Sequence, residues 1–534
     1  MASPDTPTVT DLLLARATDD GPGLRFEDAS WSWAEHIRRA AAYAAGFAAL
    51  RRPGIPFHIG ILADNLPEFS FALAGAALSG AVLVGLNPTR RGPALARDIR
   101  LADCQLVLTE ARHADLVAGL DLDIPVFDVH SPAWQEIVSA DAPLAPVPAT
   151  PDDLLMLIFT SGTSGDPKAV RCTHGKIAFP GRMLADRFGL STSDTVYLSM
   201  PMFHSNAIMA GWSVGLAAGA TLALRRRFSA SGFLPDVRAF GATYANYVGR
   251  PLSYILATPA RVDDADNPLV IVYGNEGNEA DLAQFASRFD CLVVDGFGST
   301  EGGVAIARTP DTPTGALGKL TEGTLILDVD TGTPCPPAQF APDGRLLNPA
   351  EAIGEIVNTA GPGWFAGYYG DPAADSSRLR NGSYHSGDLG YVDSAGFCYF
   401  AGRTGDWLRV DGENLGTAPI ERILARHPSV AEVAVYGIPD PTVGDQVMAA
   451  LILRPGTTLD PGSFAAFLAA QPDLGPKQLP RYVRIAATLP RTATYKVVKR
   501  ALAAEGLACP GPIWHRSGAE FQPLESLDVQ APSS

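Results

Sequence analysis

The sequence predicts an α/β fold: a large N-terminal domain of parallel-rich sheets with crossover helices and a β-rich subdomain, then a small mobile α+β C-terminal domain. The 534 residues exceed what one ordinary hydrophobic core accommodates, so two or more domains are expected. From residue 153 to about 310, short apolar runs ending in glycine-rich turns alternate with helical segments. From about 312 to 400, short strands and Gly/Pro turns predict the β-rich subdomain.

The individual elements follow from their apolar periodicity. In the N-terminal domain we expect a helix over 32–50 and strands over 58–63, 104–110, 154–159, 195–200, 220–224, 269–274, 291–298, 354–358 and 396–403. Residues 121–152 are rich in Pro, Ala and Asp and are expected to form an exposed connection. After residue 403 we expect helices over 418–427 and 460–471 and strands over 430–439 and 447–453.

Composition narrows the class of protein. With 46% hydrophobic and 18% charged residues the chain is globular. A net charge of −16 argues against a broad nucleic-acid surface but allows one local phosphate site. The most apolar stretch, 71–86, is short and reads as a helix entering a buried strand, and the start lacks a signal-peptide pattern. We therefore expect a cytoplasmic protein without stable membrane insertion, and its six scattered cysteines are expected to be reduced thiols.

One loop carries phosphate-binding chemistry. "TSGTSGDPKAV" (160–170) follows the apolar run 154–159 and offers backbone N–H groups, hydroxyls and Lys168. It is a poor Walker A motif, because Pro167 precedes Lys168 and Ala169 follows it. The chain has only six lysines among 41 basic residues, which draws attention to Lys168 and Lys496 as positions that need an ammonium group. Taken alone, the stretch is equally compatible with a flexible surface loop.

Further motifs in fixed order identify the family that the sequence resembles. They are "PMFHSNA" (201–207), "GFGSTEGG" (296–303), "GEIV" (354–357), "YHSGDLGYVD" (384–393), "GRTGDWLRVDGENLGTAPIE" (403–421) and "PRTATYKVVKRAL" (490–502). Together with the loop 160–170 they resemble the adenylate-forming superfamily of acyl-CoA synthetases, luciferases and peptide-synthetase adenylation domains. "ATYANYVGRPLSYIL" (242–256) and "GPIWHRSGAEFQPL" (511–524) resemble the very-long-chain acyl-CoA synthetase and fatty acid transport protein branch.

The resemblance implies ATP, Mg²⁺ and coenzyme A as cofactors, and it assigns roles to particular residues. The residues implied to hold the β- and γ-phosphates are Thr160, Ser161, Gly162, Thr163, Ser164, Gly165 and Lys168. Those implied around adenine and the α-phosphate are Gly274, Asn275, Glu276, Gly296, Phe297, Gly298, Ser299 and Thr300. Glu301 is implied to bind Mg²⁺, and Asp388 and Arg403 are implied to bind the ribose or a phosphate. Gly412 is implied to lie near the pantetheine of coenzyme A. Lys496 is implied to bridge the substrate carboxylate and the α-phosphate.

Other residues keep two interpretations. His204 gates the acyl pocket by resemblance, or is a core histidine bonded to the backbone. Trp212, Gly215, Tyr244 and Tyr247 are candidates for the acyl pocket, but such residues are equally what a core needs. Lys499 is interpreted as solvated.

The resemblance also implies domain boundaries and a reaction. The expected domains are an AMP-binding domain (1–402), a hinge (403–406) and a C-terminal domain with the catalytic lysine (407–534). The expected enzyme activates a hydrophobic acid, either a fatty acid or a sterol side-chain acid, to acyl-AMP and then to acyl-CoA. The alternatives are an enzyme that loads a carrier-protein thiol and a lipid-binding or uptake protein without catalysis. The expected partners of the enzyme are the small-molecule acid, ATP and coenzyme A rather than nucleic acid. The sequence leaves open whether the protein forms a homodimer.

Overall fold

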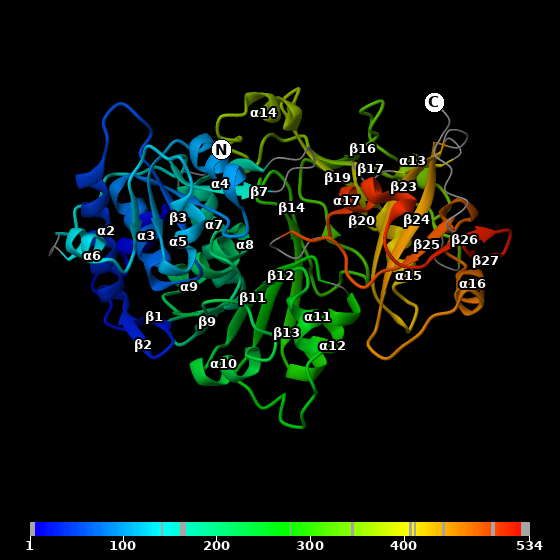
Figure 1. Cartoon of the computed structure of the whole chain (residues 1–534), viewed down its shortest axis with the longest axis horizontal. Coiled ribbons are helices and arrows are strands. Elements are labelled where there is room, and N and C mark those ends of the chain that lie inside the picture. The colour runs from blue at the N-terminus through cyan, green and yellow to red at the C-terminus, as the bar shows by residue number, and fades with distance from the viewer. Residues whose placement is uncertain are drawn as a thin grey trace. The chain divides into compact units, whose positions relative to one another are not determined.

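The computed structural model describes residues 6–139, 143–160, 167–277, 279–342, 346–404, 408–410, 413–440, 444–492 and 497–524. The chain clusters into two compact units, the first made of residues 1–305 and 362–377 and the second of 306–361 and 378–534. It passes between them three times: within strand β14 (Ala305–Ala307), between Gly361 and Pro362, and within helix α14 (Pro372–Arg378). Each unit combines helices with sheets, so the predicted α/β class is confirmed (Figure 1).

The first unit contains a sheet of six described strands that is parallel apart from its last pair. In sheet order the strands are β6 (Val126–Asp128), β5 (Cys104–Thr109), β3 (His58–Leu62), β4 (Val82–Gly85), β7 (Leu154–Thr160) and β8 (Lys168–Thr173). Every residue of β3, β4 and β5 is buried, as expected for strands covered on both faces. Strands β7 and β8 form an antiparallel hairpin at one edge.

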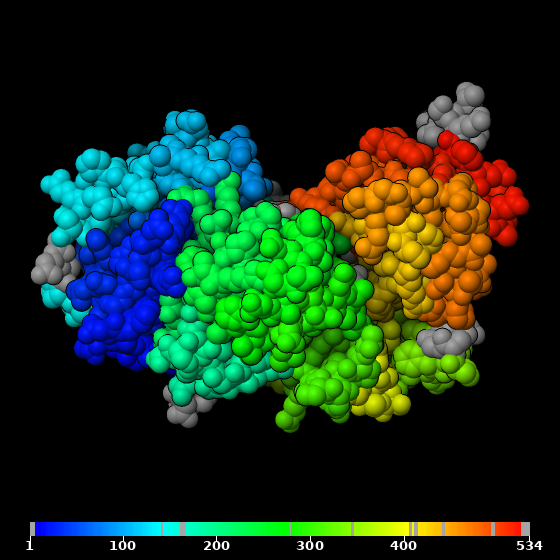
Figure 2. Space-filling model, turned by 90° about the horizontal axis from the view of Figure 1, so that it is seen from below, coloured from blue at the N-terminus to red at the C-terminus, as the bar shows by residue number. Residues whose placement is uncertain are grey.

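A second sheet, with eight described strands, belongs to the same unit except for β14, within which the chain passes into the second unit. In sheet order its strands are β14, β13 (Leu292–Gly298), β12 (Ile271–Asn275), β11 (Tyr244–Val248), β9 (Thr195–Leu198), β10 (Thr221–Leu224), β1 (Pro22–Phe26) and β2 (Ala29–Ser32). Strand β1 runs parallel to β10, and Figure 2 shows the blue N-terminal residues packed directly against green residues of this unit. Because β11, β12 and β13 are parallel, their carboxyl ends meet at one edge.

The longer helices of this unit start where the sequence provides caps. Ser32 accepts a hydrogen bond from the Glu35 N–H at the start of α2 (Trp33–Leu50), and Thr173 caps α7 (His174–Phe188) in the same way. Helix α3 (Pro67–Ser79) is buried on nearly all sides and leads into β4, as predicted for the stretch 71–86. The other helices are α1 (Val9–Leu14), α4 (Gly92–Leu101), α5 (Ala114–Ala118), α6 (Pro132–Val138), α8 (Ser205–Ala207), a π-helix (Ile208–Trp212), α9 (Ser213–Ala218), α10 (Phe233–Phe240), α11 (Pro251–Leu256) and α12 (Glu279–Phe289). A search of the described residues finds no helix with the length and apolar character needed to cross a membrane.

The proline-rich stretch 121–152 is more structured than predicted. It contains β6 and α6, and the side chain of Trp134 is completely buried. The Trp134 ring packs edge-on against Tyr43 of α2, with 5.4 Å between the ring centroids. The expectation of an exposed connection is therefore wrong for residues 126–138, because this aromatic side chain ties the segment to α2.

The second unit contains two sheets. The first has antiparallel strands in the order β15 (Gly318–Lys319), β20 (Phe397–Arg403), β19 (Ser383–Val392), β17 (Gly354–Asn358) and β16 (Thr324–Leu327), with β18 (Leu379–Arg380) beside β19. The second has the order β22 (Glu413–Leu415), β21 (Leu408–Val410), β24 (Gly444–Leu453), β25 (Tyr482–Ile485), β26 (Ile513–Ser517) and β27 (Glu520–Pro523), with β23 (Val430–Asp440) beside β24. Helices α13 (Pro349–Ala352), α15 (Thr417–Leu424), α16 (Pro461–Ala469) and α17 (Lys499–Glu505) complete the unit. The expected α+β module after residue 403 is therefore present.

A cluster of charged side chains, in which the carboxylates are buried and the arginines partly exposed, joins the two sheets of the first unit. Asp64 follows β3, Glu110 follows β5, and Arg226 and Arg227 follow β10. Arg227 donates two hydrogen bonds to Asp64, at 2.8 and 2.9 Å, and Arg226 donates to Glu110 at 2.7 Å. His113 lies 3.0 Å from Asp64 through Nε2. Since each carboxylate is paired with an arginine, the cluster is an ion-pair network rather than a metal site.

Removal of Arg227 is expected to destabilise the protein. Burial alone would raise the pKa of Asp64, but hydrogen bonds from His113 and Arg227 outweigh burial and lower this pKa to about 2. This stabilisation is therefore complete at neutral pH and is lost as the pH falls from about 4 to about 2. We expect Arg227→Ala to lower the free energy of unfolding by about 2 kcal/mol at pH 7, as measured by urea unfolding.

The difference between Arg227→Ala and the wild type should shrink toward pH 2, because acid removes the same contribution from the wild type. Arg112→Ala is the matched control: Arg112 is exposed to a similar extent as Arg227, but it lies 3.9 Å from Asp64, whereas Arg227 donates two hydrogen bonds to it. It should change the free energy of unfolding by less than about 0.5 kcal/mol. Equal effects of the two substitutions would contradict the assigned pairing.

Candidate active site

The predicted phosphate loop is the turn of the β7–β8 hairpin. Thr160 at the end of β7 pairs with Lys168 at the start of β8, and both residues are half-buried. Ser161, Gly162, Thr163, Ser164 and Gly165 lie outside the described residues, so their part in phosphate binding stays a prediction. The hairpin nevertheless places a lysine and a threonine at the base of the loop, where β7 emerges from the core.

Glu301 from the "STE" motif meets Lys168 through a third residue, Tyr368. The Tyr368 hydroxyl donates a hydrogen bond to Oε1 of Glu301 at 3.0 Å, and both side chains are buried. The Lys168 ammonium lies over the ring of the same tyrosine, 5.1 Å from its centroid. Lys168 and Glu301, which are 133 positions apart in the sequence (301 − 168), therefore share one neighbour.

A buried lysine binds the backbone of the "STE" motif. Lys176 of α7 donates hydrogen bonds to the carbonyl oxygens of Glu301 at 2.9 Å and Arg171 at 3.1 Å. Burial lowers the pKa of its ammonium group. Gly302 has a φ of +73°, and its carbonyl accepts from the Trp364 N–H at 3.0 Å. The backbone of the motif is thus fixed from two sides.

The "PMFH" segment lies next to this motif. Ser205 and Thr300 are joined by a hydrogen bond of 2.7 Å between their hydroxyl oxygens. His204, half-buried, precedes α8 and lies against Phe203, with ring centroids 4.4 Å apart. Asn65 holds the segment by donating to the Met200 carbonyl and accepting from the Met202 N–H. The gating role of His204 stays a prediction.

The carboxyl ends of β11, β12 and β13 are joined by side-chain amides. Asn275 donates to the Gly296 carbonyl at 2.7 Å, and Asn206 donates to the Tyr247 carbonyl at 2.9 Å. A Cβ at Gly274 would lie 2.2 Å from the Tyr247 carbonyl oxygen, so only glycine fits there. The edge predicted to hold adenine is therefore a closely packed backbone surface.

The remaining predicted nucleotide residues lie at the same edge. Glu276 directly follows β12 with an exposed side chain and a φ of +64°. Phe297 and Gly298 are the last residues of β13, Phe297 half-buried and Gly298 exposed. Ser299 is exposed and leads to Thr300. The structure thus brings these residues together at one strand edge, as the motif predicted.

The four pocket candidates lie in the core. Trp212 is completely buried and donates through Nε1 to the Ser70 hydroxyl, and the Tyr244 hydroxyl donates to the Ala210 carbonyl. A Cβ at Gly215 would meet Leu222 at 2.3 Å. Tyr247 is buried and donates to Asp295. This burial favours the core interpretation, and a role of these residues in holding an acyl chain stays a prediction.

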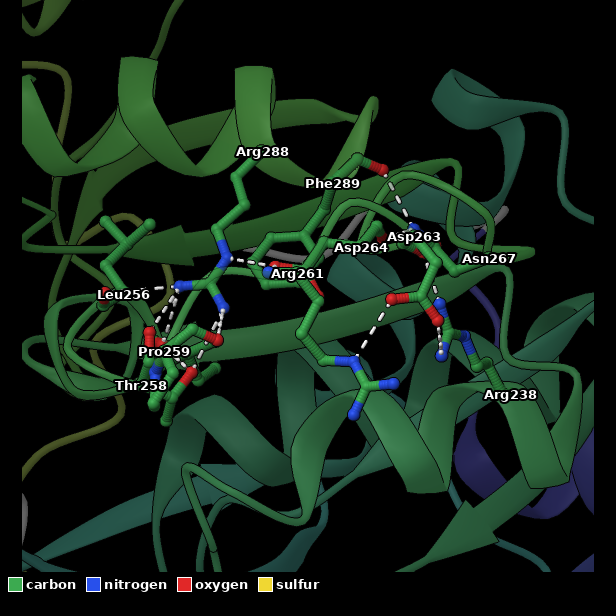
Figure 3. Close-up of polar contacts among 11 residues, drawn as sticks. Arg238, Leu256, Thr258, Pro259, Arg261, Asp263, Asp264, Asn267, Arg288 and Phe289 are labelled. Atoms are coloured by element: carbon green, nitrogen blue, oxygen red, sulfur yellow. Dashed lines mark hydrogen bonds and ion pairs between the residues drawn. The ribbon is translucent and has the colours of Figure 1, made fainter.

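Arg288 is a positioning side chain that the sequence analysis missed. It lies near the end of α12, and its guanidinium donates to the carbonyls of Leu256, Thr258 and Pro259 beyond the end of α11 (Figure 3). It also pairs with the buried Asp264 at 2.6 Å. Carbonyls at the end of a helix need such donors. Arg288 thereby fixes the loop that follows α11.

In the second unit, Asp388 and Arg403 are adjacent. They pair across β19 and β20, and Arg403 Nε lies 3.3 Å from Oδ1 of Asp388. The buried Glu355 of β17 supports this turn: it accepts from the Gly387 N–H and lies 2.8 Å from His385 Nδ1. The motif "GEIV" therefore supplies a carboxylate that orders the residues beside Asp388.

Besides the phosphate loop, three further predictions fall partly or wholly outside the described residues. Lys496 and Gly412 lie outside them, as do Gly405 and Asp406 of the predicted hinge.

The interpretation of Lys499 as solvated is wrong. Its ammonium donates to the Thr417 hydroxyl and pairs with Glu421, both at 2.8 Å, because α17 packs where α15 offers these acceptors.

The described residues fit a nucleotide with a divalent cation. Glu301 supplies a carboxylate and Thr300 a hydroxyl, the oxygen ligands that Mg²⁺ prefers. Lys168 supplies a cation on the same unit for phosphate charge.

Comparison with known families matches residues 13–369 to the AMP-binding enzyme family and residues 419–496 to the AMP-binding enzyme C-terminal domain. The chain is 58% identical to the medium/long-chain-fatty-acid–CoA ligase FadD17 of Mycobacterium tuberculosis, over 96% of this chain and 99% of that protein. It is 47% identical to the steroid-22-oyl-CoA synthetase of Rhodococcus jostii, over 96% and 93% of the two chains. The fold is similar to that of ATP-bound MatB from Rhodopseudomonas palustris, with a TM-score of 0.81 and 22% identity over 93% of this chain and 99% of that one.

These comparisons agree with the ordered motifs, and the resemblance inferred from them is confirmed. The chain belongs to the AMP-binding enzyme family, and within it to the branch of AMP-forming acyl-CoA ligases.

Proposed function

We propose that this acyl-CoA synthetase activates a hydrophobic carboxylic acid, either a medium- to long-chain fatty acid or the side-chain acid of a sterol. The observation that carries this proposal is the approach of Lys168 and Glu301 to one tyrosine, an arrangement suited to the phosphates of ATP. The relatives named for fatty-acid and steroid-acid ligation support the class of substrate.

The reaction has two steps. An oxygen of the carboxylate attacks the α-phosphorus of ATP, pyrophosphate leaves, and acyl-AMP forms. The thiol of coenzyme A then attacks the acyl carbon, loses its proton, and releases AMP. The enzyme must align several anions and offset their repulsion, which calls for cations and oriented N–H groups.

The described residues of each unit are assigned separate roles. In the first unit, Lys168 neutralises phosphate charge, Thr300 lies near the α-phosphate, and Glu301 would hold Mg²⁺, which neutralises phosphate oxygens when bound. The edge formed by Gly274, Asn275 and Phe297 accepts adenine. In the second unit Asp388 accepts hydrogen bonds from the ribose hydroxyls, and Arg403 fixes its orientation.

A screen of acid substrates tests the proposal. The intact chain is incubated with ATP, Mg²⁺ and fatty, aromatic or sterol acids, with and without coenzyme A, and AMP release is measured. We expect release that requires a fatty or sterol acid and rises when coenzyme A is added. Release with aromatic acids alone would contradict the substrate class. Release without any response to coenzyme A would favour a carrier-protein thiol, and no release with any acid would favour a lipid-binding protein.

Substitution of Glu301 tests the magnesium site. Glu301→Gln keeps the size of the side chain but removes its charge, so we expect acid-dependent pyrophosphate exchange to fall about 100-fold. Part of the loss should be recovered at high Mg²⁺ concentration. Glu136→Gln, at an exposed position of α6, is the control and should match the wild type. Unchanged exchange in Glu301→Gln would contradict the metal assignment.

A further inference from the structure

Tyr368 lies on a short segment that runs beside β8 without belonging to the named strands. The Tyr369 N–H donates to the Ala169 carbonyl at 2.7 Å, and the Arg171 N–H donates to the Gly367 carbonyl at 3.0 Å. Val170 and Tyr368 thereby form an isolated antiparallel bridge. The bridge fixes the backbone of Tyr368 beside β8, and the hydrogen bonds on either side of it fix Gly367 and Tyr369.

The two tyrosines of this segment contact different parts of the first unit. The Tyr368 hydroxyl donates to Glu301, whereas the Tyr369 hydroxyl donates to Asp103 at 2.8 Å. Tyr369 also packs against His58, with 5.0 Å between the ring centroids. Of this adjacent pair, Tyr368 is the one that contacts residues assigned to ATP and Mg²⁺, namely Glu301 and Lys168.

The hydroxyl of Tyr368 is suited to orient the carboxylate of Glu301. It is a neutral donor, so it binds one carboxylate oxygen without neutralising the negative charge that a cation requires. The backbone of Glu301 is held independently by Lys176. Fixing both the backbone and Oε1 restricts the direction in which the carboxylate can present its second oxygen.

The ring of Tyr368 is suited to place the ammonium of Lys168. A cation over an aromatic face is attracted to it while its N–H groups can still bind phosphate. One side chain thus contacts both the cation and the anion of the proposed phosphate site.

We propose that Tyr368 is a positioning residue for adenylation, whose hydroxyl orients Glu301 toward Mg²⁺ and whose ring orients Lys168 toward the phosphates of ATP. This proposal rests on the proposed function, since it assumes that Lys168 and Glu301 bind Mg²⁺·ATP. It predicts separable effects of the hydroxyl and of the ring.

Two substitutions separate these parts in the full-length chain. Tyr368→Phe removes the hydroxyl and keeps the ring, so the Mg²⁺ concentration needed for half-maximal pyrophosphate exchange should rise about tenfold. The KM for ATP at saturating Mg²⁺ should change less than about twofold. Tyr368→Leu removes both parts and should additionally raise the KM for ATP about fivefold. Calorimetric titration with ATP, once in the presence of Mg²⁺ and once in EDTA, measures binding without turnover. It should separate the effect of the hydroxyl from that of the ring in the same way.

Tyr369→Phe is the matched control, because it removes from the same segment a tyrosine hydroxyl that donates to Asp103 instead of Glu301. Its Mg²⁺ requirement and KM for ATP should match those of the wild type. The proposal is overturned if Tyr368→Phe leaves the Mg²⁺ requirement unchanged or lowers it, or if Tyr369→Phe raises it equally. If the wild type itself activates no acid, the proposed function fails instead. Calorimetry still tests the placement of Glu301 and Lys168 in that case.

Discussion

Lys496→Ala is expected to reduce acid-dependent pyrophosphate exchange about 100-fold or more while largely sparing thioester formation from synthetic acyl-adenylate. The family motif implies that this ammonium bridges the attacking carboxylate and the α-phosphate. Charge develops there only during adenylation, so loss of one oriented cation should act on that step. Once acyl-AMP has formed, attack by the thiol no longer requires the bridge.

Measurement of both half-reactions on the same preparation distinguishes this role from a general defect. Lys319→Ala is the control, because Lys319 is an exposed residue of the second unit that pairs with Asp311 at 3.8 Å. Such a surface pair contributes little, so both half-reactions should remain near wild-type rates. Equal loss of both half-reactions in Lys496→Ala would show that the lysine serves the fold or both steps.

Much of the fold could be predicted from local patterns. The strand over 154–159 and the helix over 32–50 have apolar spacing that burial in the structure reproduces. The strand over 291–298 is present as β13, although Leu292 is exposed and Asp295 is buried. Residues 126–138 were missed because the prediction followed the Pro, Ala and Asp content of the longer stretch 121–152, while one buried Trp134 decides their packing. The association of residues 306–361 with residues 378–534 in one unit depends on side-chain packing that local texture does not encode. The domain boundary after residue 402 stays a prediction.

The residues of the candidate site likewise fall into those that the sequence could predict and those that it could not. Lys168, Glu301 and Asp388 could be found because each lies in a motif whose residue order carries its chemistry. Tyr368 and Lys176 could not, since their roles depend on contacts with Glu301 across 67 and 125 residues of sequence. Lys499 was misjudged for the same reason: a charge near the end of the chain looks solvated until its partner Glu421 is known.

Lys176 should affect both stability and catalysis when it is replaced by methionine. Methionine fills similar space but leaves the carbonyls of Glu301 and Arg171 without this donor. Unsatisfied buried carbonyls destabilise the fold, whereas removal of a buried charge offsets part of that loss. We therefore expect the free energy of unfolding to fall by about 2 kcal/mol, as measured by urea unfolding.

The catalytic effect of Lys176→Met should exceed what this loss of stability explains. The ammonium fixes the backbone that carries Glu301, and a displacement of about 1 Å at such a site can reduce a rate about 100-fold. Pyrophosphate exchange should therefore fall at temperatures where the variant is fully folded, with a raised Mg²⁺ requirement. Arg182→Met, at an exposed position of the same helix, should change neither property. If Lys176→Met lost stability but kept wild-type exchange, Lys176 would join the backbones of Arg171 and Glu301 without governing the Glu301 carboxylate. The orientation of that carboxylate would then rest on Tyr368 alone.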